Sequence, residues 1–485
     1  MIDRTRDALY YASKLKTGDC SSEELIHASF KRIAQENPKL NAVIHTRKEE
    51  ALKEAQSRHW ADTPFKGIPI LLKDLGQNLA GFPATAGSKL LKHYRADKTS
   101  YFVSQLQAAG FIPIGSTNVP EFGFTNITHS ELYGPARNPF DTALSAGGSS
   151  GGASAAVASG MVPLAGASDG GGSIRIPASF TGLVGLKPTR GRTPIGPGSG
   201  RAWQGAAISF ALTKTIRDTA ALLDQMQVLQ PAAAFSTPLF TEGFLNSLDQ
   251  AFEKPLTVAF SLTSPIGGPV SNDARQAVLQ AVDWLENKGY AVEEACPDID
   301  GRRLMQAYYA MNAGESAAMM GRLETVLDRP LGPDDMELLT WVLQESGKKL
   351  TAVEYANALT LWDDAAERMW HFNKTYDLYL QPATAHPAPR NDKVYWSNAF
   401  VKRMKQADTL SAAEQQQLIW DMWEESLDLT PFTQQANLTG QPAISLPTYM
   451  TREGLPLGIQ LTAPKGREDW LLKIGQQMEQ EGLFI

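Results

Sequence analysis

The sequence predicts an α/β fold in which most strands run parallel. Residues 68–72 form an apolar run between turn residues, a pattern typical of a strand buried on both faces. Further along, an apolar run at 256–260, a helical pattern capped by Ser271 and a strand pattern at 289–293 form a strand–helix–strand unit. Because such a unit joins parallel neighbours of one sheet, the two observations together favour a helix-covered sheet.

Helical and strand patterns alternate along the chain. The first helices are expected at 3–15 and 23–35, the second begun by a capping box of Ser21 and Glu24 and ended before Pro38. Residues 301–375 are expected to be helical. Further helices are expected at 49–57, 101–109, 153–158, 215–226, 271–287, 411–426 and 467–480, and further strands at 41–45, 111–115, 162–164, 378–382 and 457–461.

Composition excludes several classes of function. The 485 residues carry a net charge of −7 and contain no long run of lysine or arginine, which argues against a basic nucleic-acid-binding surface. The two cysteines, Cys20 and Cys296, lack the spacing of a zinc site or a disulfide framework. With no apolar signal core and no apolar run of 18 residues, we expect a cytoplasmic protein without a membrane span.

A glycine- and serine-rich stretch at 146–187 is punctuated by apolar residues, unlike a flexible linker. Its clusters at 147–152 and 170–172 place Ser149 and Ser173 beside glycines. Backbone N–H groups converging at 170–173 would bind negative charge, as amide hydrolysis requires for its oxyanion. Alternatively, Ser173 is an ordinary helix N-cap.

Lys73 ends the apolar run at 68–72. One interpretation is that its amine reaches solvent at a strand terminus. The other is that the amine lies in a dry site, where loss of hydration lowers the pKa and a neutral lysine could act as a base.

Three motifs together resemble those of the amidase signature family: GIPILLKD (67–74), GGSSGG (147–152) and SDGGGSIRIPASFTGLVGLKPT (168–189). The resemblance implies one large domain, residues 1–485, with a mixed, mostly parallel central sheet covered by helices on both faces. It also implies a catalytic signature core at 60–225 and a helical substrate-pocket region at 300–425. Six of the ten tryptophans lie at 341–423, where most should pack helices and some should line a cavity.

The family mechanism then implies three catalytic residues. Ser173 corresponds to the nucleophile that forms an acyl-enzyme, and Lys73 corresponds to the base. Ser149 corresponds to the serine that relays the proton, preceded by a cis peptide bond. No metal or cofactor is implied.

The remaining site residues follow from the same resemblance. The N–H groups of Gly170, Gly171, Gly172 and Ser173 would form the oxyanion hole, and Gly123 would face the substrate. Asp169 and Arg175 would brace the loop through hydrogen bonds and an ion pair. The sequence departs from the family at Gly170, where members commonly have a larger residue such as Thr or Ile.

Parts of the chain, including RIPAS (175–179) and KPTRGR (187–192), are most similar to the 6-aminohexanoate cyclic dimer hydrolase subgroup, which would place Asn312 near the pocket. The favoured function is therefore an amidase acting on a small linear or cyclic amide. Two alternatives remain open: the amidase subunit of a tRNA-dependent amidotransferase, and a catalytically inactive binding protein. A homodimer is also left open.

Overall fold

The computed structural model describes residues 3–57, 63–252 and 254–485. Its strands are β1 (Val43–Thr46), β2 (Pro69–Lys73), β3 (Ile112–Thr117), β4 (His129–Ser130), β5 (Gly134–Pro135), β6 (Ala165–Asp169), β7 (Val184–Lys187), β8 (Ile208–Thr213), β9 (Thr257–Phe260), β10 (Ala291–Glu294), β11 (Leu378–Pro382), β12 (Ala443–Met450) and β13 (Pro456–Thr462).

Its helices are α1 (Ala8–Thr17), α2 (Ser22–Leu40), α3 (Lys48–Ser57), α4 (Tyr101–Ala108), α5 (Gly151–Ala158), α6 (Arg175–Thr181), α7 (Ile216–Met226), α8 (Phe244–Ser247), α9 (Asn272–Asn287), α10 (Gly301–Leu327), α11 (Leu338–Lys349), α12 (Ala352–Phe372), α13 (Asn398–Lys405), α14 (Ala412–Leu429), α15 (Gln434–Thr439) and α16 (Glu468–Gln480). Within the described residues, none of these helices is long and apolar enough to cross a membrane.

Eleven of the described strands form one mixed sheet in the order β1-β3-β2-β6-β8-β7-β12-β13-β11-β9-β10. The predicted β9–α9–β10 unit is confirmed, because β9 and β10 pair in parallel. Parallel pairing predominates only in two parts of the sheet, β3-β2-β6 and β11-β9-β10. The strands from β6 to β11 pair antiparallel. The expected predominance of parallel pairs is thus limited to these parts. The short β12–β13 turn imposes one antiparallel pair, and the other antiparallel pairs in the centre join strands that no short turn connects.

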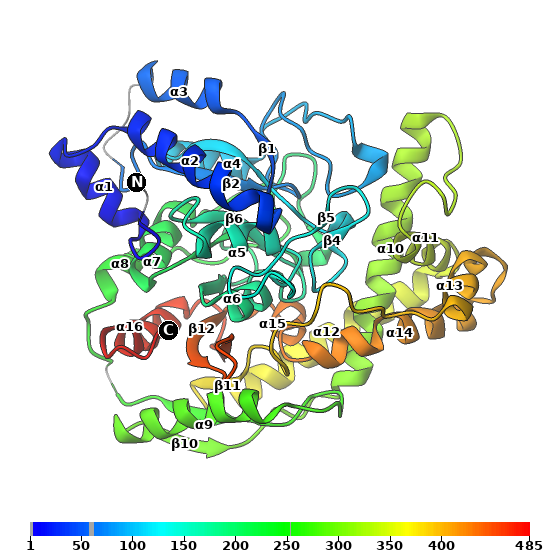
Figure 1. Cartoon of the computed structure of the whole chain (residues 1–485). Coiled ribbons are helices and arrows are strands. Elements are labelled where there is room, and N and C mark those ends of the chain that lie inside the picture. Colours follow the sequence, from blue (N-terminus) through cyan, green and yellow to red (C-terminus); the bar gives the residue numbers. More distant parts are fainter. Residues whose placement is uncertain (1–2, 58–62, 253) are drawn as a thin grey trace.

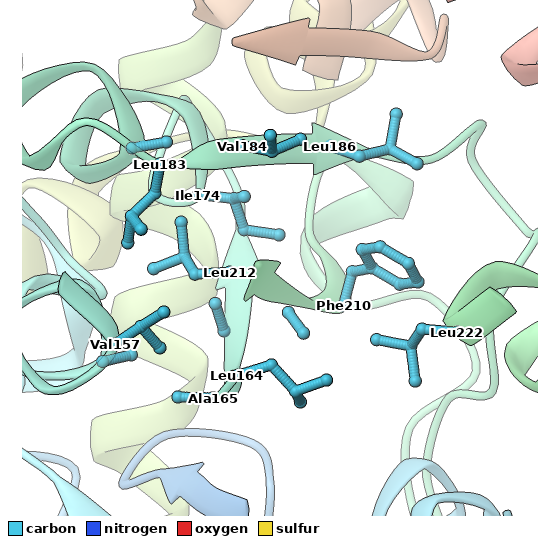
Figure 2. Packing of buried hydrophobic residues seen from close by; sticks show 14 of the residues in the cluster. Val157, Leu164, Ala165, Ile174, Leu183, Val184, Leu186, Phe210, Leu212 and Leu222 are labelled. Carbon is cyan, nitrogen blue, oxygen red and sulfur yellow. The ribbon is translucent and has the colours of Figure 1, made fainter. Parts of the chain in front are cut away.

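Helices cover both faces of the sheet, as predicted. Helices α5 and α6 pack on one face, and α7 and α16 pack on the other. Figure 2 shows Val157 of α5 and Leu222 of α7 on opposite sides of Leu212 and Phe210 of β8. A second buried apolar cluster joins α10, α11, α12 and α14 at one side of the molecule (Figure 1).

Several local predictions were wrong. Helix α2 continues past Pro38 to Leu40, because a proline in the last turn removes only one helical hydrogen bond and Asn41 then ends the helix with a left-handed backbone. Residues 162–163 form a bend, Leu164 has no regular structure, and the strand begins at Ala165. Strands β7, β8 and β12 and helix α13 were not predicted; Gly185 interrupts the pattern of β7 and Pro447 that of β12.

The sheet topology brings the sequence motifs to one edge. Strand β2 ends at Lys73, and its parallel neighbour β6 ends at Asp169. Parallel neighbours present their carboxyl ends at the same edge, which is where α/β proteins place their sites. Ser149 lies just before α5, and this helix packs on β6 and β2. The lysine and the two glycine-rich segments are therefore neighbours in space.

A close backbone contact fixes α5 in this position. A Cβ atom at Gly152 would lie 2.4 Å from the backbone nitrogen of Asn118 and 2.6 Å from the carbonyl oxygen of Ala42. We predict that Gly152→Ala lowers the free energy of unfolding by about 1–3 kcal/mol through overpacking, measured by urea denaturation.

Gly321→Ala is the matched control. Gly321 lies on an exposed face of α10 with open space around its Cα. The added methyl group should stabilise this helix by about 0.5–1 kcal/mol. Equal effects of the two substitutions would contradict the packing explanation.

Candidate active site

The amine of Lys73 is buried in the protein. Its side chain is 1% exposed, and Nζ donates to Ser149 Oγ at 2.8 Å and to the carbonyl oxygen of Ser168 at 3.2 Å. Burial lowers the pKa of Lys73 to about 7, although the negative charge of Asp169 opposes the shift. Of the two interpretations of this lysine, the structure supports the dry site. A substantial neutral fraction is available near pH 7.

Ser149 is held at the start of α5, and the peptide bond Gly148–Ser149 is cis. The backbone of Ile127 leaves no room for a side chain at Gly148, where a Cβ would lie 2.5 Å from the Ile127 carbonyl carbon. Gly123 also lies close to the serine, since a Cβ there would be 3.2 Å from Ser149 Oγ. Glycines therefore permit two close backbone approaches around this hydroxyl group.

Ser173 follows β6 in a turn that precedes α6. The carboxylate of Asp169 accepts hydrogen bonds from the N–H groups of Gly172 at 2.6 Å and Ile174 at 3.2 Å. The expectation that all the N–H groups of 170–173 converge on the cavity therefore needs correction, because the N–H of Gly172 is engaged with Asp169. In the described part of the chain, the N–H groups of Gly170, Gly171 and Ser173 have no hydrogen-bond acceptor. These donors remain available to an oxyanion.

The two serine hydroxyl groups share a cavity without a direct contact. Ser149 and Ser173 both line it. Over the residues that the structure describes, no hydrogen bond joins the two hydroxyls. Catalytic hydrogen bonds are often long or misaligned before substrate binds, so this geometry leaves a proton relay between them open.

A buried ion pair supports the turn. Asp169 and Arg175 are both fully buried, and Arg175 Nη2 and Nε each lie 2.9 Å from a carboxylate oxygen of Asp169. Burial disfavours the charge on Asp169, but Arg175 outweighs this effect and holds the pKa of Asp169 well below its ordinary range. Arg175 also donates to Gln460 Oε1 at 2.7 Å and to Asn437 Oδ1 at 2.6 Å. The ion pair thus ties the turn to β13 and α15.

The carbonyl groups of the turn are held as well. The hydroxyl of Tyr308, on α10, donates to Gly170 O at 2.8 Å. The hydroxyl of Thr433 donates to Gly171 O at 2.7 Å. With both carbonyls engaged, the peptide planes of the turn have little freedom to rotate.

The cavity beside these residues has a volume of about 730 Å³. Ser149, Ser173, Gly123, Gly170 and Gly171 line it, whereas Lys73 and Gly172 do not. Asn312 lies in its wall, as the resemblance implied. The larger apolar and aromatic lining residues include Phe122, Phe124, Trp203, Phe235, Met305, Tyr308, Tyr309, Met319, Trp423 and Leu427.

Sequence reasoning missed part of this wall. Of the six tryptophans at 341–423, only Trp423 lines the cavity, and Trp341, Trp362 and Trp420 are buried in the second apolar cluster. Phe124 and the segment 190–209, which carries Trp203, were not predicted to contribute. The run Pro-Ile-Gly-Pro-Gly-Ser-Gly at 194–200 was the available signal, because such a dense turn sequence is typical of a functional loop.

Comparison with known proteins identifies the class of enzyme. A family model described as Amidase matches residues 24–472. A lipoamidase from Enterococcus faecalis is 43% identical over 97% of this chain, and the chain spans 63% of that relative's length. A 6-aminohexanoate-cyclic-dimer hydrolase from Paenarthrobacter ureafaciens is 34% identical over 99% of this chain and 95% of its own length.

Solved structures agree with the sequence relatives. The structure of 6-aminohexanoate cyclic dimer hydrolase complexed with substrate is similar with a TM-score of 0.88 at 32% identity, covering 100% of this chain and 98% of that chain. A bacterial aryl acylamidase has a TM-score of 0.84 at 25% identity, covering 99% and 96% of the two chains. The chain therefore belongs to the amidase signature family and is an amide-hydrolysing enzyme.

The Asp169–Arg175 pair gives a stability test. We predict that Asp169→Asn lowers the free energy of unfolding by about 3–5 kcal/mol, because it leaves the Arg175 charge buried without a counter-charge. The pKa of Asp169 is depressed in the folded state. Its stabilisation is therefore complete above the ordinary carboxyl pKa of 3.8 and is lost as the pH falls toward the folded value. Urea denaturation of both proteins should show a constant difference from pH 5 to 8 and a smaller one in acid.

Asp392→Asn is the control, because Asp392 pairs with Arg390 at an exposed position. Its effect should stay within about 0.5 kcal/mol. A comparably small effect at Asp169 would show that the buried pair does not support the turn.

Proposed function

We propose that this enzyme hydrolyses amides through an acyl-enzyme on Ser173, with Ser149 and Lys73 as the proton relay. The observation that carries the proposal is the 2.8 Å contact of the buried Lys73 amine with Ser149 Oγ, at the cavity that Ser173 also lines. Serine alone is a weak nucleophile near pH 7 and needs an adjacent base. A neutral lysine reached through a second hydroxyl provides one.

In the first step, Ser173 Oγ attacks the amide carbonyl carbon. Its proton passes to Ser149 Oγ while the proton of Ser149 passes to neutral Lys73. The N–H groups of Gly171 and Ser173 stabilise the oxyanion, a contribution of about 3–4 kcal/mol for each donor in other acyl-transfer enzymes. The protonated lysine then returns a proton through Ser149 to the nitrogen, the C–N bond breaks, and the amine leaves.

In the second step, water replaces the amine. The same relay removes a proton from water, which attacks the acyl carbon of the ester. Ser173 leaves with the returned proton, and the carboxylic acid is released. The chain thus needs only its own three side chains and main-chain donors for the complete cycle.

The cavity supports a substrate with an apolar body. Aromatic and aliphatic side chains from α10 and α14 make up one part of its wall, so we assign residues 300–425 to substrate binding. We assign residues 60–225 to catalysis, and their Phe124 and Trp203 complete the wall on the other side of the cavity. The names of the two sequence relatives support a linear or cyclic amide. Hydrolysis by the purified chain alone would distinguish this amidase from an amidotransferase subunit that requires partner chains.

The nucleophile can be tested directly. We expect Ser173→Ala to abolish turnover with an unchanged melting temperature, because the hydroxyl makes no hydrogen bond in the described structure. A fluorophosphonate probe should add to Ser173 of the native enzyme, as located by peptide mass spectrometry. Ser104→Ala, on an exposed face of α4, is the control and should remain active and labelled. An adduct on another serine, or none, would refute the assignment.

The base can be tested through pH. Because the pKa of Lys73 is about 7 and only the neutral amine accepts a proton, kcat/KM should rise with pH through this value and fall tenfold per pH unit below it. Lys73→Ala should slow acylation by several orders of magnitude. A flat profile down to pH 5 would contradict the role of base.

Two neighbouring groups need controls in the same experiment. Burial raises the pKa of Asp74 and lowers that of Lys187, in each case to about 7. If Lys73 is the titrating group, Asp74→Asn and Lys187→Met should still show the fall in kcat/KM below pH 7. If either variant lost the fall in kcat/KM at acidic pH, the titrating group would be the substituted residue and not Lys73.

A further inference from the structure

A strained turn forms part of the cavity wall. Three consecutive non-glycine residues, Ala202, Trp203 and Gln204, have left-handed φ angles of 37°, 53° and 52°. Each costs of the order of 1–3 kcal/mol and persists only where the surroundings impose it. Trp203 lines the cavity and is half-buried. A run of such residues next to a proposed nucleophile points to a specific use for the side chain that it presents.

The turn is fastened from two sides. Gln204 Nε2 donates to Glu315 Oε1 of α10 at 2.8 Å, and Tyr355 of α12 donates to the same oxygen at 2.8 Å. On the other side, Arg190 Nε donates to Gly205 O at 2.9 Å, and its Nη2 donates to Leu438 O at 2.8 Å. The two anchors hold Gln204 and Gly205, the residues that directly follow Trp203, and so limit the movement of the turn that carries the indole ring.

The indole ring contacts both an aromatic neighbour and the catalytic turn. It stacks on Phe124 with the ring centroids 5.7 Å apart and the planes 12° apart. A Cβ atom built on Gly170 would lie 3.4 Å from Trp203 Cε3 and 3.5 Å from Ala207 Cβ. A methyl group would therefore just fit at position 170, whereas a longer or branched side chain would displace the ring.

This contact gives a physical reason for a small residue at position 170. On the neighbouring residue, a Cβ at Gly171 would lie 2.8 Å from Tyr308 Oη. The Trp203 and Tyr308 rings thus both lie against the 170–171 backbone. Gly171 carries one of the free N–H groups of the turn, so the indole lies beside the place where the reacting carbonyl would sit.

We propose that Trp203 is a specificity-determining residue that selects the shape of the acyl group next to the scissile carbonyl, with Gly170 as its matched partner. The inference rests on the proposed function, which places the carbonyl at the N–H groups of Gly171 and Ser173. The flat indole face admits an acyl group that continues as an unbranched chain or a flat ring. It excludes branching at the carbon attached to the carbonyl.

The experiment compares two fluorophosphonate probes, one with an unbranched alkyl group on phosphorus and one branched at the first carbon. The alkyl group stands in for the acyl chain, and no natural substrate is required. The second-order rate of labelling of Ser173 is measured for each probe. An extra methylene group in an apolar pocket typically changes the rate by about 10–200-fold. We therefore expect the native enzyme to react with the unbranched probe at least tenfold faster than with the branched one.

Trp203→Ala should reduce that preference at least fivefold, mainly by accelerating the branched probe, and Trp203→Phe should give an intermediate ratio. Trp370→Ala is the matched control, because Trp370 is 58% exposed and does not line the cavity. Its ratio should equal that of the native enzyme. Melting temperatures identify any variant that fails to fold. If Trp203→Ala does not fold, the probe ratio of Trp203→Phe decides the outcome.

The partnership with Gly170 is tested by a double-mutant cycle. Gly170→Thr should slow labelling by both probes at least tenfold, because the added atoms collide with the indole ring. Adding Trp203→Ala should restore at least part of the rate, so the two effects should not be additive. Additive effects, or an unchanged probe ratio in Trp203→Ala, would overturn the inference. Failure of the native enzyme to label at Ser173 would instead overturn the proposed function.

Discussion

The removal of one lysine amine from water is the constraint on which the rest of the site depends. Strand β2 is buried along its whole length, and its last residue, Lys73, ends inside the protein. An ammonium ion there lacks hydration, so the neutral form becomes accessible near pH 7. The amine still needs hydrogen-bond partners, and Ser149 and the carbonyl of Ser168 are both in reach. The burial of the strand end thereby lowers the pKa of Lys73 and requires the hydroxyl of Ser149 to lie within hydrogen-bond distance of its amine.

At the end of the neighbouring strand β6, a buried ion pair between Asp169 and Arg175 has the opposite effect on protonation. Asp169 ends β6 in an equally buried position, but Arg175 keeps it ionised. The carboxylate then orders the following turn by accepting two backbone N–H groups. Two neighbouring strands therefore end in ionisable groups of opposite behaviour. One is a cation that burial tends to neutralise, and the other is an anion that its partner keeps charged.

Much of the fold and the position of the site could be predicted from the sequence. The buried strand before Lys73, the helix after Ser149 and the parallel β9–α9–β10 unit each follow from local patterns of apolar and turn residues. The antiparallel centre of the sheet does not, since pairing there depends on contacts between segments that are distant in sequence. The hydrogen bond from the Gly172 N–H to Asp169 could not be predicted from the sequence either, because it depends on the orientation of one peptide plane. Trp203 could not be assigned to the wall because a strained turn leaves no periodic pattern.

The separation of the two largest apolar clusters has an evolutionary consequence. One cluster packs the sheet and its covering helices, whereas the other packs α10, α11, α12 and α14, and the cavity lies where residues of both regions meet. Mutations that reshape the helical cluster can alter what enters the cavity while the packing beneath Lys73 and Asp169 stays intact. Such an arrangement lets the range of amide substrates change during evolution while the catalytic residues keep their positions.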